Sequence, residues 1–358
     1  MLKSPLIFII NPGSTTTKLA LYQGQAEIFQ SQITHRRGQL EKFTDIESQS
    51  QYRTKCTLGE LKKQKINLAD IDIFMGRGGL IKPVSGGTFI INETMLEELR
   101  TQKYGKHASN MGAIIADKLA QKHNKPAYIA NPVVVDELSD IARITGHKEM
   151  PRRSVFHALS HKAAGQYMAD KLKTDYKKLN MIIAHCGGGI SIAAHQKGRI
   201  VDVNNALEGD GPFTPERTGS LCLMQFNRYV RDNNFSYTEA YKLVSRNGGL
   251  INHLGTNDCR KIEDKALNGD ADFKLVYDAF IYQIGKAIGS LAPALNGKVD
   301  AIVLTGGIAN SKYFVKKVKS MTKFIAQIHI ITDNLEMSGL ARCGLDIYQG
   351  KAKPQVYK

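Results

Sequence analysis

Residues 6–24, LIFIINPGSTTTKLALYQG, place two apolar segments on either side of a short polar loop. Branched and aromatic side chains dominate residues 6–10 and 18–22, and Gly24 follows the second segment, which is typical of a β-hairpin. Residues 26–29 continue the same β-type composition. The sequence therefore predicts an antiparallel meander of three strands at the start of the chain.

The same layout returns at residues 181–198, MIIAHCGGGISIAAHQKG. A strand at 181–184 leads into a glycine loop, a second strand at 190–195 and a turn, and a third strand follows at 199–203. Two such copies predict two similar domains, each opening with an antiparallel meander. Placing one copy on the other without gaps superimposes Ile9 on Ile183, Gly13 on Gly187, Ala20 on Ala194 and Gly24 on Gly198.

Alternating helices and strands are expected after each meander. Short apolar runs typical of buried parallel strands occur at residues 71–75, 127–130 and 299–304. Apolar side chains recur at helical spacing in residues 93–103, 110–123, 154–172 and 273–295, and Ser154 would cap the third of these helices. The fold class is therefore α/β. Because no Pro- or Ser-rich linker separates the copies, we expect a tight domain connection near residues 150–154.

The composition is that of a globular protein. The chain has 358 residues, of which 42% are hydrophobic and 23% charged, so it can form two domains of ordinary size. Its longest apolar run, residues 6–10, is too short for a membrane span or a secretory signal, and we expect a soluble cytoplasmic protein. The five cysteines form no CxxC pair and no cluster with histidines, which predicts neither a zinc site nor a disulfide framework.

The net charge of +16 raises the question of a nucleic-acid partner. Lysines occur in short interrupted runs, such as residues 62–65 and 316–319, without interleaved aromatic residues or a recognisable nucleic-acid module. We therefore interpret the excess charge as solvated basic surface, and we expect neither nucleic acid nor a membrane as a partner.

Three loops at expected strand ends have the composition of a phosphate site. Residues 11–18, NPGSTTTK, offer a glycine, several hydroxyls, an amide and a lysine, but not the G-x-x-x-x-G-K-[ST] order of a Walker A loop. Residues 185–189, HCGGG, and 304–310, LTGGIAN, supply glycines through which backbone amides can face an anion. Each loop alone also fits an ordinary tight turn. Together they favour a nucleotide phosphate over a Rossmann cofactor, whose G-x-G-x-x-G is missing.

Two arginines lie among glycines where a ligand could reach them. Arg77 stands in residues 76–79, GRGG, and Arg217 in residues 211–219, GPFTPERTG. Phosphoryl transfer needs fixed positive charge where negative charge builds up, so both are candidate substrate ligands, the alternative being ordinary surface arginines. Asp136 follows an apolar run and is a candidate Mg²⁺ ligand or, alternatively, a helix cap.

Two histidines, His157 and His161, are spaced i and i+4. They lack the glutamate of an H-E-x-x-H zinc motif, and no third ligand is near in sequence. We therefore expect both on the surface of a helix.

Six segments, in this order, resemble the acetokinase family: residues 11–18 (NPGSTTTK), 76–80 (GRGGL), 107–110 (HASN), 131–137 (NPVVVDE), 185–189 (HCGGG) and 304–307 (LTGG). The resemblance extends over essentially the whole chain. It implies the fold shared by actin, sugar kinases and chaperone ATPases, in which two duplicated domains flank a nucleotide cleft. The expected domains are residues 1–152, completed by a C-terminal helix at 337–358, and residues 153–336.

The resemblance also implies an activity: direct transfer of the γ-phosphoryl group of ATP to a short-chain carboxylate, with Mg²⁺, giving an acyl phosphate and ADP. The implied catalytic residues are Arg77, Arg217, His185 and Asp136. Asp136 and Glu336 would hold the metal. The nucleotide would be bound by Asn11, Ser14, Thr16, Lys18, His107, Gly187, Gly188, Gly306, Gly307, Ile308 and Asn310.

Two departures from acetate kinases bear on the acid. Acetate kinases are usually longer and carry H-G-G where this chain has RGG at 77–79, and D-T-A-F-H where it has VDELS at 135–139. These differences favour butyrate or isobutyrate as substrate, with acetate or propionate as the alternative. The family further implies a homodimer or larger homo-oligomer. A non-catalytic, ATP-switched binding protein on the same fold is the rival from another class.

Overall fold

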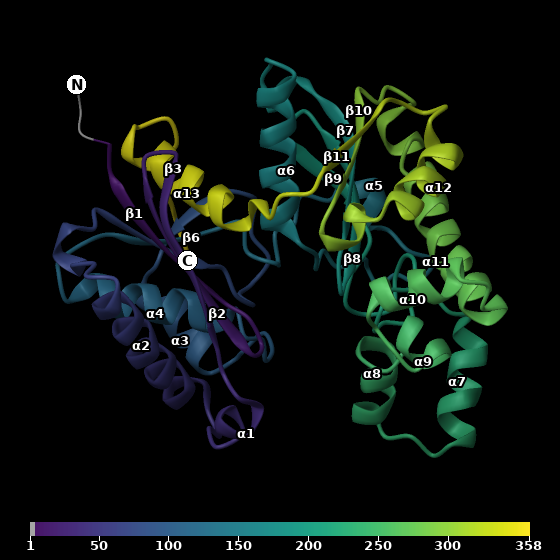
Figure 1. The fold of residues 1–358 in the computed structure, drawn as a ribbon, viewed down its shortest axis with the longest axis horizontal. Coiled ribbons are helices and arrows are strands. Elements are labelled where there is room, and N and C mark those ends of the chain that lie inside the picture. Colours follow the sequence, from purple (N-terminus) through teal and green to yellow (C-terminus); the bar gives the residue numbers. More distant parts are fainter. Residues whose placement is uncertain (1–3) are drawn as a thin grey trace. The chain divides into compact units, whose positions relative to one another are not determined.

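The computed structural model describes residues 4–358, which form two compact units. Unit 1 consists of Met1–Val135 together with Leu335–Lys358, and unit 2 is Asp136–Asn334. Each unit is built around one β-sheet that carries helices on both faces (Figure 1). Among the described residues, no helix is long and apolar enough to cross a membrane.

The sheet of unit 1 has seven strands in the order β12-β5-β6-β4-β1-β2-β3. The first three strands form the predicted antiparallel meander, and β4 and β6 then add parallel to β1. The short strands β5 and β12 extend the sheet beyond β6. The strands are β1 (Leu6–Pro12), β2 (Thr16–Gln23), β3 (Ala26–Thr34), β4 (Ile73–Arg77), β5 (Thr88–Ile90), β6 (Ala127–Ala130) and β12 (Gln355–Val356).

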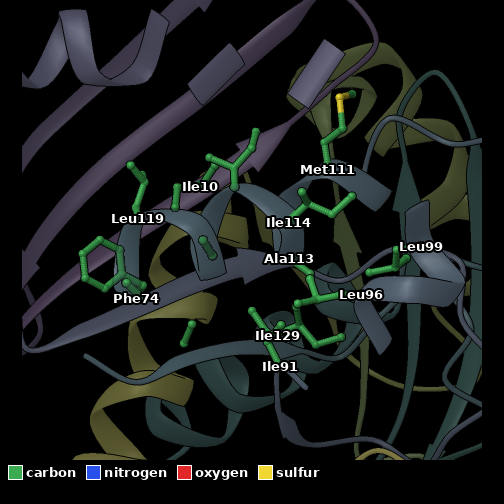
Figure 2. Packing of buried hydrophobic residues seen from close by; sticks show 14 of the residues in the cluster. Ile10, Phe74, Ile91, Leu96, Leu99, Met111, Ala113, Ile114, Leu119 and Ile129 are labelled. Atoms are coloured by element: carbon green, nitrogen blue, oxygen red, sulfur yellow. The ribbon is translucent and has the colours of Figure 1, made fainter. Parts of the chain in front are cut away.

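Helices α2, α3 and α4 lie on one side of this sheet and α13 on the other (Figure 1). Asp45 and Asn92 cap α2 and α3, because their side chains accept hydrogen bonds from the backbone of the first helical turn. An apolar core that includes Phe74, Ile114 and Ile129 fills the space between helices and strands (Figure 2). The helices are α1 (Arg37–Leu40), α2 (Ile46–Lys63), η1 (Leu68–Asp70), α3 (Glu93–Arg100), α4 (Asn110–Gln121) and α13 (Leu335–Tyr348).

A close approach of α4 to β4 fixes the backbone at the end of that strand. A Cβ atom on Gly76 would lie 2.4 Å from the carbonyl oxygen of Gly112, and one on Gly112 would lie 2.3 Å from the carbonyl oxygen of Arg77. Both distances are far below van der Waals contact, so only glycine fits at either position. The backbone of Arg77 is therefore held directly against α4.

The sheet of unit 2 has five strands in the order β11-β10-β7-β8-β9. β7, β8 and β9 form the second antiparallel meander, and β10 and β11 add parallel to β7. This is the arrangement of β6-β4-β1-β2-β3 in unit 1, which confirms the predicted duplication and the α/β class. The strands are β7 (Asn180–Cys186), β8 (Ile190–Gln196), β9 (Arg199–Val203), β10 (Ala301–Thr305) and β11 (Ile328–Ile331).

Helix α6 covers one side of this sheet, and α11 and α12 lie on the other (Figure 1). Helix α6 begins at Ala158, and His157 occupies its N-cap position. The predicted cap at Ser154 is therefore wrong. The helices are α5 (Asp140–Arg143), α6 (Ala158–Lys171), η2 (Tyr176–Lys178), α7 (Leu223–Asp232), α8 (Tyr237–Ser245), α9 (Leu250–Leu254), α10 (Cys259–Leu267), α11 (Ala271–Ser290), η3 (Pro293–Leu295), η4 (Gly307–Asn310) and α12 (Lys312–Thr322).

The gap-free superposition of the two copies is wrong by one residue after the first strand. Ile9 pairs with Ala20, whereas Ile183 pairs with Ala193 and not with Ala194. The hairpin tip of unit 2 is one residue shorter, since only residues 187–189 separate its last ladder pair, against 13–16 in unit 1. The register shifts between β2 and β3 and between β8 and β9 agree with this gap, because they follow Leu21 and Ala194.

The expected domain boundaries lie after residues 152 and 336. In the structure, the boundaries between the two units instead fall after residues 135 and 334. Residues 136–152 contact the second sheet. The backbone N–H of Ser139 donates to Val201 of β9, and the guanidinium of Arg152 donates to Asp202 at 2.7 Å. These contacts join the segment to unit 2.

Candidate active site

In unit 1 the candidate residues gather where the parallel strands β1 and β4 end. The ladder pairs Ile10 with Gly76, so Asn11 and Arg77 emerge side by side at the carboxyl ends of the strands. The Arg77 guanidinium donates to the Asn11 side-chain oxygen at 3.2 Å and to the Glu336 carboxylate at 3.1 Å. The Asn11 amide also donates to Glu336, at 2.9 Å. Three residues distant in sequence thus form one polar cluster, which we call the Arg77 cluster.

The hairpin tip between β1 and β2 is organised by Arg53, a residue that the sequence did not single out. Arg53 lies on α2 and is fully buried. Its guanidinium donates to the backbone carbonyls of Gly13, Ser14 and Thr16 at 2.7 to 2.9 Å. Burial lowers the pKa of Arg53 to about 10, so it stays charged at neutral pH. The arginine therefore occupies the carbonyl oxygens of the tip, and Ser14 is left exposed.

The remaining nucleotide candidates of unit 1 lie on or near the same strands. Lys18 pairs directly with Asn11 across the β1–β2 ladder, so the two side chains share one face of the sheet. Thr16 opens β2 and lies two residues before Lys18 on the same face. His107 precedes α4, where its Nδ1 lies 2.6 Å from the Oγ of Ser109.

In unit 2 two glycine loops meet at the ends of β7 and β10. The ladder pairs His185 with Thr305, which brings the loops 185–189 and 305–310 together. Gly306 has a φ of +89°, and a Cβ there would lie 2.4 Å from the carbonyl oxygen of Cys186, so this contact requires glycine. Gly307, Ile308 and Asn310 follow in η4, directly before Ser311 caps α12, as the sequence predicts for a strand-to-helix turn.

Arg217 lies against the first of these loops. Its Nη1 donates to the carbonyl oxygen of Ala206 at 2.7 Å, while its Nε is buried without a hydrogen-bond partner among the described residues. Thr214 Oγ1 donates to the carbonyl oxygen of Gly188 at 3.1 Å, which ties the arginine loop to the glycine loop. Burial lowers the pKa of Arg217. A buried arginine that has an unpaired N–H donor is suited to binding an anionic ligand.

Because residue 189 is a glycine, Arg217 and His157 can both approach the glycine loop at this point. A Cβ on Gly189 would lie 2.0 Å from Nη1 of Arg217 and 3.1 Å from Cε1 of His157. The rings of His157 and His185 lie 4.6 Å apart between centroids. We call His157, His185, Gly189 and Arg217 the His185 cluster.

The prediction that His157 and His161 lie on a helix surface is wrong. His161 is fully buried, and His157 is half-buried beside His185. Both rings bond to the hydroxyl of Ser191, each at 2.8 Å. The signal was present in the sequence: Ser191 and His195 alternate on one face of an apolar strand, and such buried polar groups need partners from the helix packed over them.

Asp136 is held by an arginine. Both of its carboxylate oxygens accept from the guanidinium of Arg143, at 2.7 and 2.9 Å, and one also accepts from the backbone N–H of Leu138. Within residues 4–358, no group of three or more His, Cys, Asp or Glu side chains could hold a metal ion. The carboxylate of Glu336, in the Arg77 cluster, is the other candidate ligand.

The chain is similar to known proteins over almost its whole length. Residues 138–356 match the model of the acetokinase family. Butyrate kinase 1 of Clostridium acetobutylicum is 42% identical over 352 residues, covering 98% of this chain and 99% of the relative. The crystal structure of Porphyromonas gingivalis acetate kinase covers 96% of this chain with a TM-score of 0.81 at 19% identity, and all of that chain is covered. The crystal structure of a propionate kinase from Francisella tularensis has a TM-score of 0.74 at 21% identity. The match covers 95% of this chain and 98% of that chain. The fold is thus that of the acetate and propionate kinases, and the chain belongs to the acetokinase family.

Proposed function

We propose that this chain is a butyrate kinase, which transfers the γ-phosphoryl group of ATP to butyrate and yields butyryl phosphate and ADP. The observation that carries the proposal is the 42% identity, over 98% of the chain, to a protein named butyrate kinase 1. Acetate or propionate kinase is the less favoured alternative, because the solved kinases with those names are 19% and 21% identical.

The reaction is a direct displacement at phosphorus. A carboxylate oxygen of butyrate attacks the γ-phosphorus, the bond to the β–γ bridging oxygen breaks, and ADP leaves with that electron pair. No proton has to be removed from the nucleophile, because the carboxylate is already ionised at neutral pH. The task left to the protein is to position both reactants and to stabilise charge on the transferred group.

We assign the transferred phosphoryl group to the His185 cluster. Arg217 supplies a charged donor whose Nε is buried and unpaired within the described part of the chain, and this supports a role toward an anion. His157 lies near Arg217 at Gly189, His185 lies beside His157, and both rings can donate to phosphoryl oxygens. The loop 306–310 would receive the adenosine side, since a Cβ on Gly307 would meet no atom within 4 Å.

The Arg77 cluster is assigned to the carboxylate and to the phosphates of ATP. Arg77 already binds one carboxylate, that of Glu336, at 3.1 Å, so its guanidinium is oriented for this type of group. Asn11, Ser14, Thr16 and Lys18 would line the phosphates from the adjoining strands, and His107 would act near them.

Of the two carboxylates expected to hold Mg²⁺, Glu336 is better suited to the metal than Asp136. Mg²⁺ in kinases is commonly held by one or two carboxylates together with substrate phosphates and water, so a cluster of three protein ligands is not required. Glu336 fits this pattern, because it lies beside Asn11 and Arg77 at the strand ends. Asp136 fits less well, since Arg143 occupies both of its oxygens. When bound, Mg²⁺ would neutralise charge on the phosphates of ATP.

The test is a screen of short acids with ATP and Mg²⁺, with acyl phosphate trapped as the hydroxamate. Each methylene in an apolar pocket contributes about 1 to 3 kcal/mol, so butyrate should exceed acetate in kcat/KM by at least about tenfold. Acetate at or above butyrate would reject butyrate as the substrate while retaining a carboxylate kinase. Absence of acyl phosphate with every acid would reject the kinase itself. Arg217→Ala serves as the background control.

Two further expectations concern the oligomeric state, which follows from the family resemblance, and the location in the cell, which follows from the short apolar runs of the sequence. A homodimer or larger homo-oligomer is expected, and size-exclusion chromatography with light scattering measures it. A cytoplasmic location is expected as well, which fractionation of the source cells tests.

A further inference from the structure

Behind the His185 cluster runs a continuous line of hydrogen bonds through unit 2. The hydroxyl of Tyr176 lies 2.6 Å from Nδ1 of His195, and Nε2 of His195 lies 3.2 Å from Nδ1 of His161. Nε2 of His161 lies 2.8 Å from Oγ of Ser191, which in turn lies 2.8 Å from Nδ1 of His157. We call these five side chains the relay. Only His157, at one end, belongs to the His185 cluster.

Four of the five side chains of the relay are buried, and His157 is half-buried. His161, His195 and Ser191 are 0% exposed, and Tyr176 is 7% exposed. Burial lowers the pKa of His161 to about 3 and that of His195 well below its ordinary value, while burial raises the pKa of Tyr176 far above its own. All three groups are therefore neutral at physiological pH, and each neutral imidazole carries one N–H and one acceptor nitrogen.

Beside the buried part of the relay, two charged groups, Lys162 and Glu137, are paired with each other. Lys162 lies 6.0 Å above the Tyr176 ring and donates to Glu137 at 2.7 Å and to the carbonyl oxygen of Gly198. Burial lowers the pKa of Lys162, and the adjacent Glu137 raises it. The relay itself contains no carboxylate, so its proton positions are set by hydrogen bonding.

Tyr176, at one end of the relay, determines which atom donates and which accepts in every hydrogen bond of the relay. The hydroxyl of Tyr176 has His195 as its hydrogen-bond partner, so it must donate to Nδ1 or leave a buried O–H unpaired, at a cost of about 1 to 3 kcal/mol. With Nδ1 accepting, His195 carries its proton on Nε2 and donates to His161. His161 then also carries its proton on Nε2 and donates to Ser191. The hydroxyl of Ser191 is left to donate to Nδ1 of His157.

We propose that Tyr176, His195, His161 and Ser191 act as positioning residues that hold the proton of His157 on Nε2. Nδ1 of His157 is occupied as an acceptor, so Nε2 is the ring nitrogen that donates. Cε1, the ring atom between Nδ1 and Nε2, lies close to Gly189, and so does the Arg217 guanidinium, which places the ring of His157 beside that arginine. This assignment rests on the proposed function for its purpose: a donating Nε2–H stabilises a phosphoryl oxygen, whereas an Nε2 lone pair would repel it.

The sharpest test replaces one hydroxyl and keeps its ring. Tyr176→Phe removes the donor that fixes the direction, while the ring stays in place beside Lys162. Without that donor, Nδ1 of His195 is left without a partner whichever way the hydrogen bonds of the relay run. Neither orientation is then favoured, so His157 should populate both tautomers. The matched control is Tyr22→Phe, which removes the hydroxyl of another buried tyrosine, bonded to Glu27 at 2.7 Å in unit 1, without touching the relay.

The readout is the ¹⁵N chemical shifts of the ring nitrogens after selective labelling of histidine, with His157→Gln used to assign His157. We expect only the Nε2–H form of His157 in the original protein and in Tyr22→Phe, and a mixture of both forms in Tyr176→Phe. The kcat of Tyr176→Phe should fall about two- to fivefold at unchanged KM for ATP and acid, because a share of the molecules holds the wrong tautomer.

The outcomes separate the relay from the proposed function. An Nδ1–H or doubly protonated His157 in the original protein would overturn the relay, as would an unchanged tautomer in Tyr176→Phe. The NMR result as expected, without kinase activity in the original protein, would reject the proposed function and leave the relay standing. Urea unfolding of both Phe variants checks that each is folded before the comparison is made.

Discussion

Arg77 and Arg217 each end in a guanidinium that is fixed by neighbours of its own unit. Arg77 is anchored through Asn11 and Glu336, and Arg217 through Ala206. We expect Arg77→Ala and Arg217→Ala each to lower kcat by roughly 10²- to 10³-fold, because each removes a preorganised charge. Steady-state kinetics measures the change, and circular dichroism checks the fold. Near-normal turnover in either variant would remove that arginine from the mechanism.

Gly189 offers a test of packing that introduces a single methyl group. In Gly189→Ala the new Cβ would lie 2.0 Å from Nη1 of Arg217, so the guanidinium has to move. We expect a fall in kcat of at least about tenfold, since displacement of a positioned group by about 1 Å costs this much or more. The control is Gly289→Ala in α11, where a Cβ meets no atom within 4 Å. Equal activity of the two variants would show that the Arg217 position is not critical.

At the scale of elements, the tip between β1 and β2 depends on α2. Arg53→Ala would remove the donors that bind the partly buried carbonyl oxygens of Gly13 and Ser14, and the cost would be at most the value of about 1 to 3 kcal/mol that is typical for a fully buried unsatisfied group. We expect a lower free energy of unfolding and a raised KM for ATP, with the KM for the acid less affected. Urea unfolding and initial rates measure these. Arg53→Lys retains the charge but not the fork of donors, and should recover only part of the loss.

The elements themselves were largely predictable. Both meanders follow from alternating and continuous apolar runs, and β9 and β6 occupy the predicted residues 199–203 and 127–130. The register of the repeat was not predictable in the same way. Gly24 and Gly198 suggested equivalence, but the paired strands equate Gly24 with Lys197, which takes a left-handed φ of +49° in the second turn. A difference of one residue in loop length cannot be detected from the residue identities. It is evident only from the pairing of the strands.

The candidate site was predictable where it follows strand ends and not where it depends on long-range partners. Loops after β1, β4, β7 and β10 were recognised from their glycines. Arg53 and His157 were missed, because an arginine or a histidine on a helix carries no local sign that a distant loop or strand needs its donors. Asp136 was recognised by position, but its partner Arg143 was not.

At the scale of the whole molecule, the buried histidines make stability depend on pH. The folded pKa of His161 is lowered to about 3 and that of His195 is also well below 6.5, so the unfolded chain binds more protons than the folded one below pH 6.5. Their contribution to stability is fully present above pH 6.5 and is lost as the pH falls below it. Each contributes a slope of up to about 1.4 kcal/mol per pH unit.

We therefore expect the free energy of unfolding to fall steeply between pH 6.5 and 5, as measured by urea titration at several pH values. His195→Gln removes one of the two groups and should reduce the slope by about 1 kcal/mol per pH unit, even if it lowers the stability at every pH. An identical slope in the variant would mean that His195 is not held neutral in the folded protein.

The return of residues 335–358 to unit 1 matters during translation. α13 places Met337 and Leu340 in buried positions, and Gly344 lies against Ile7 and Met75 of β1 and β4. Residues 136–334 are synthesised before this helix exists, which at about 5 to 20 residues per second takes about 10 to 40 s. During that interval the nascent N-terminal sheet lacks the helix that covers one of its apolar faces, whereas unit 2 is continuous in sequence and needs no later segment to complete itself. Unit 1 therefore cannot become fully native until residues 335–358 have been made, and an apolar face of its sheet stays open to aggregation until then.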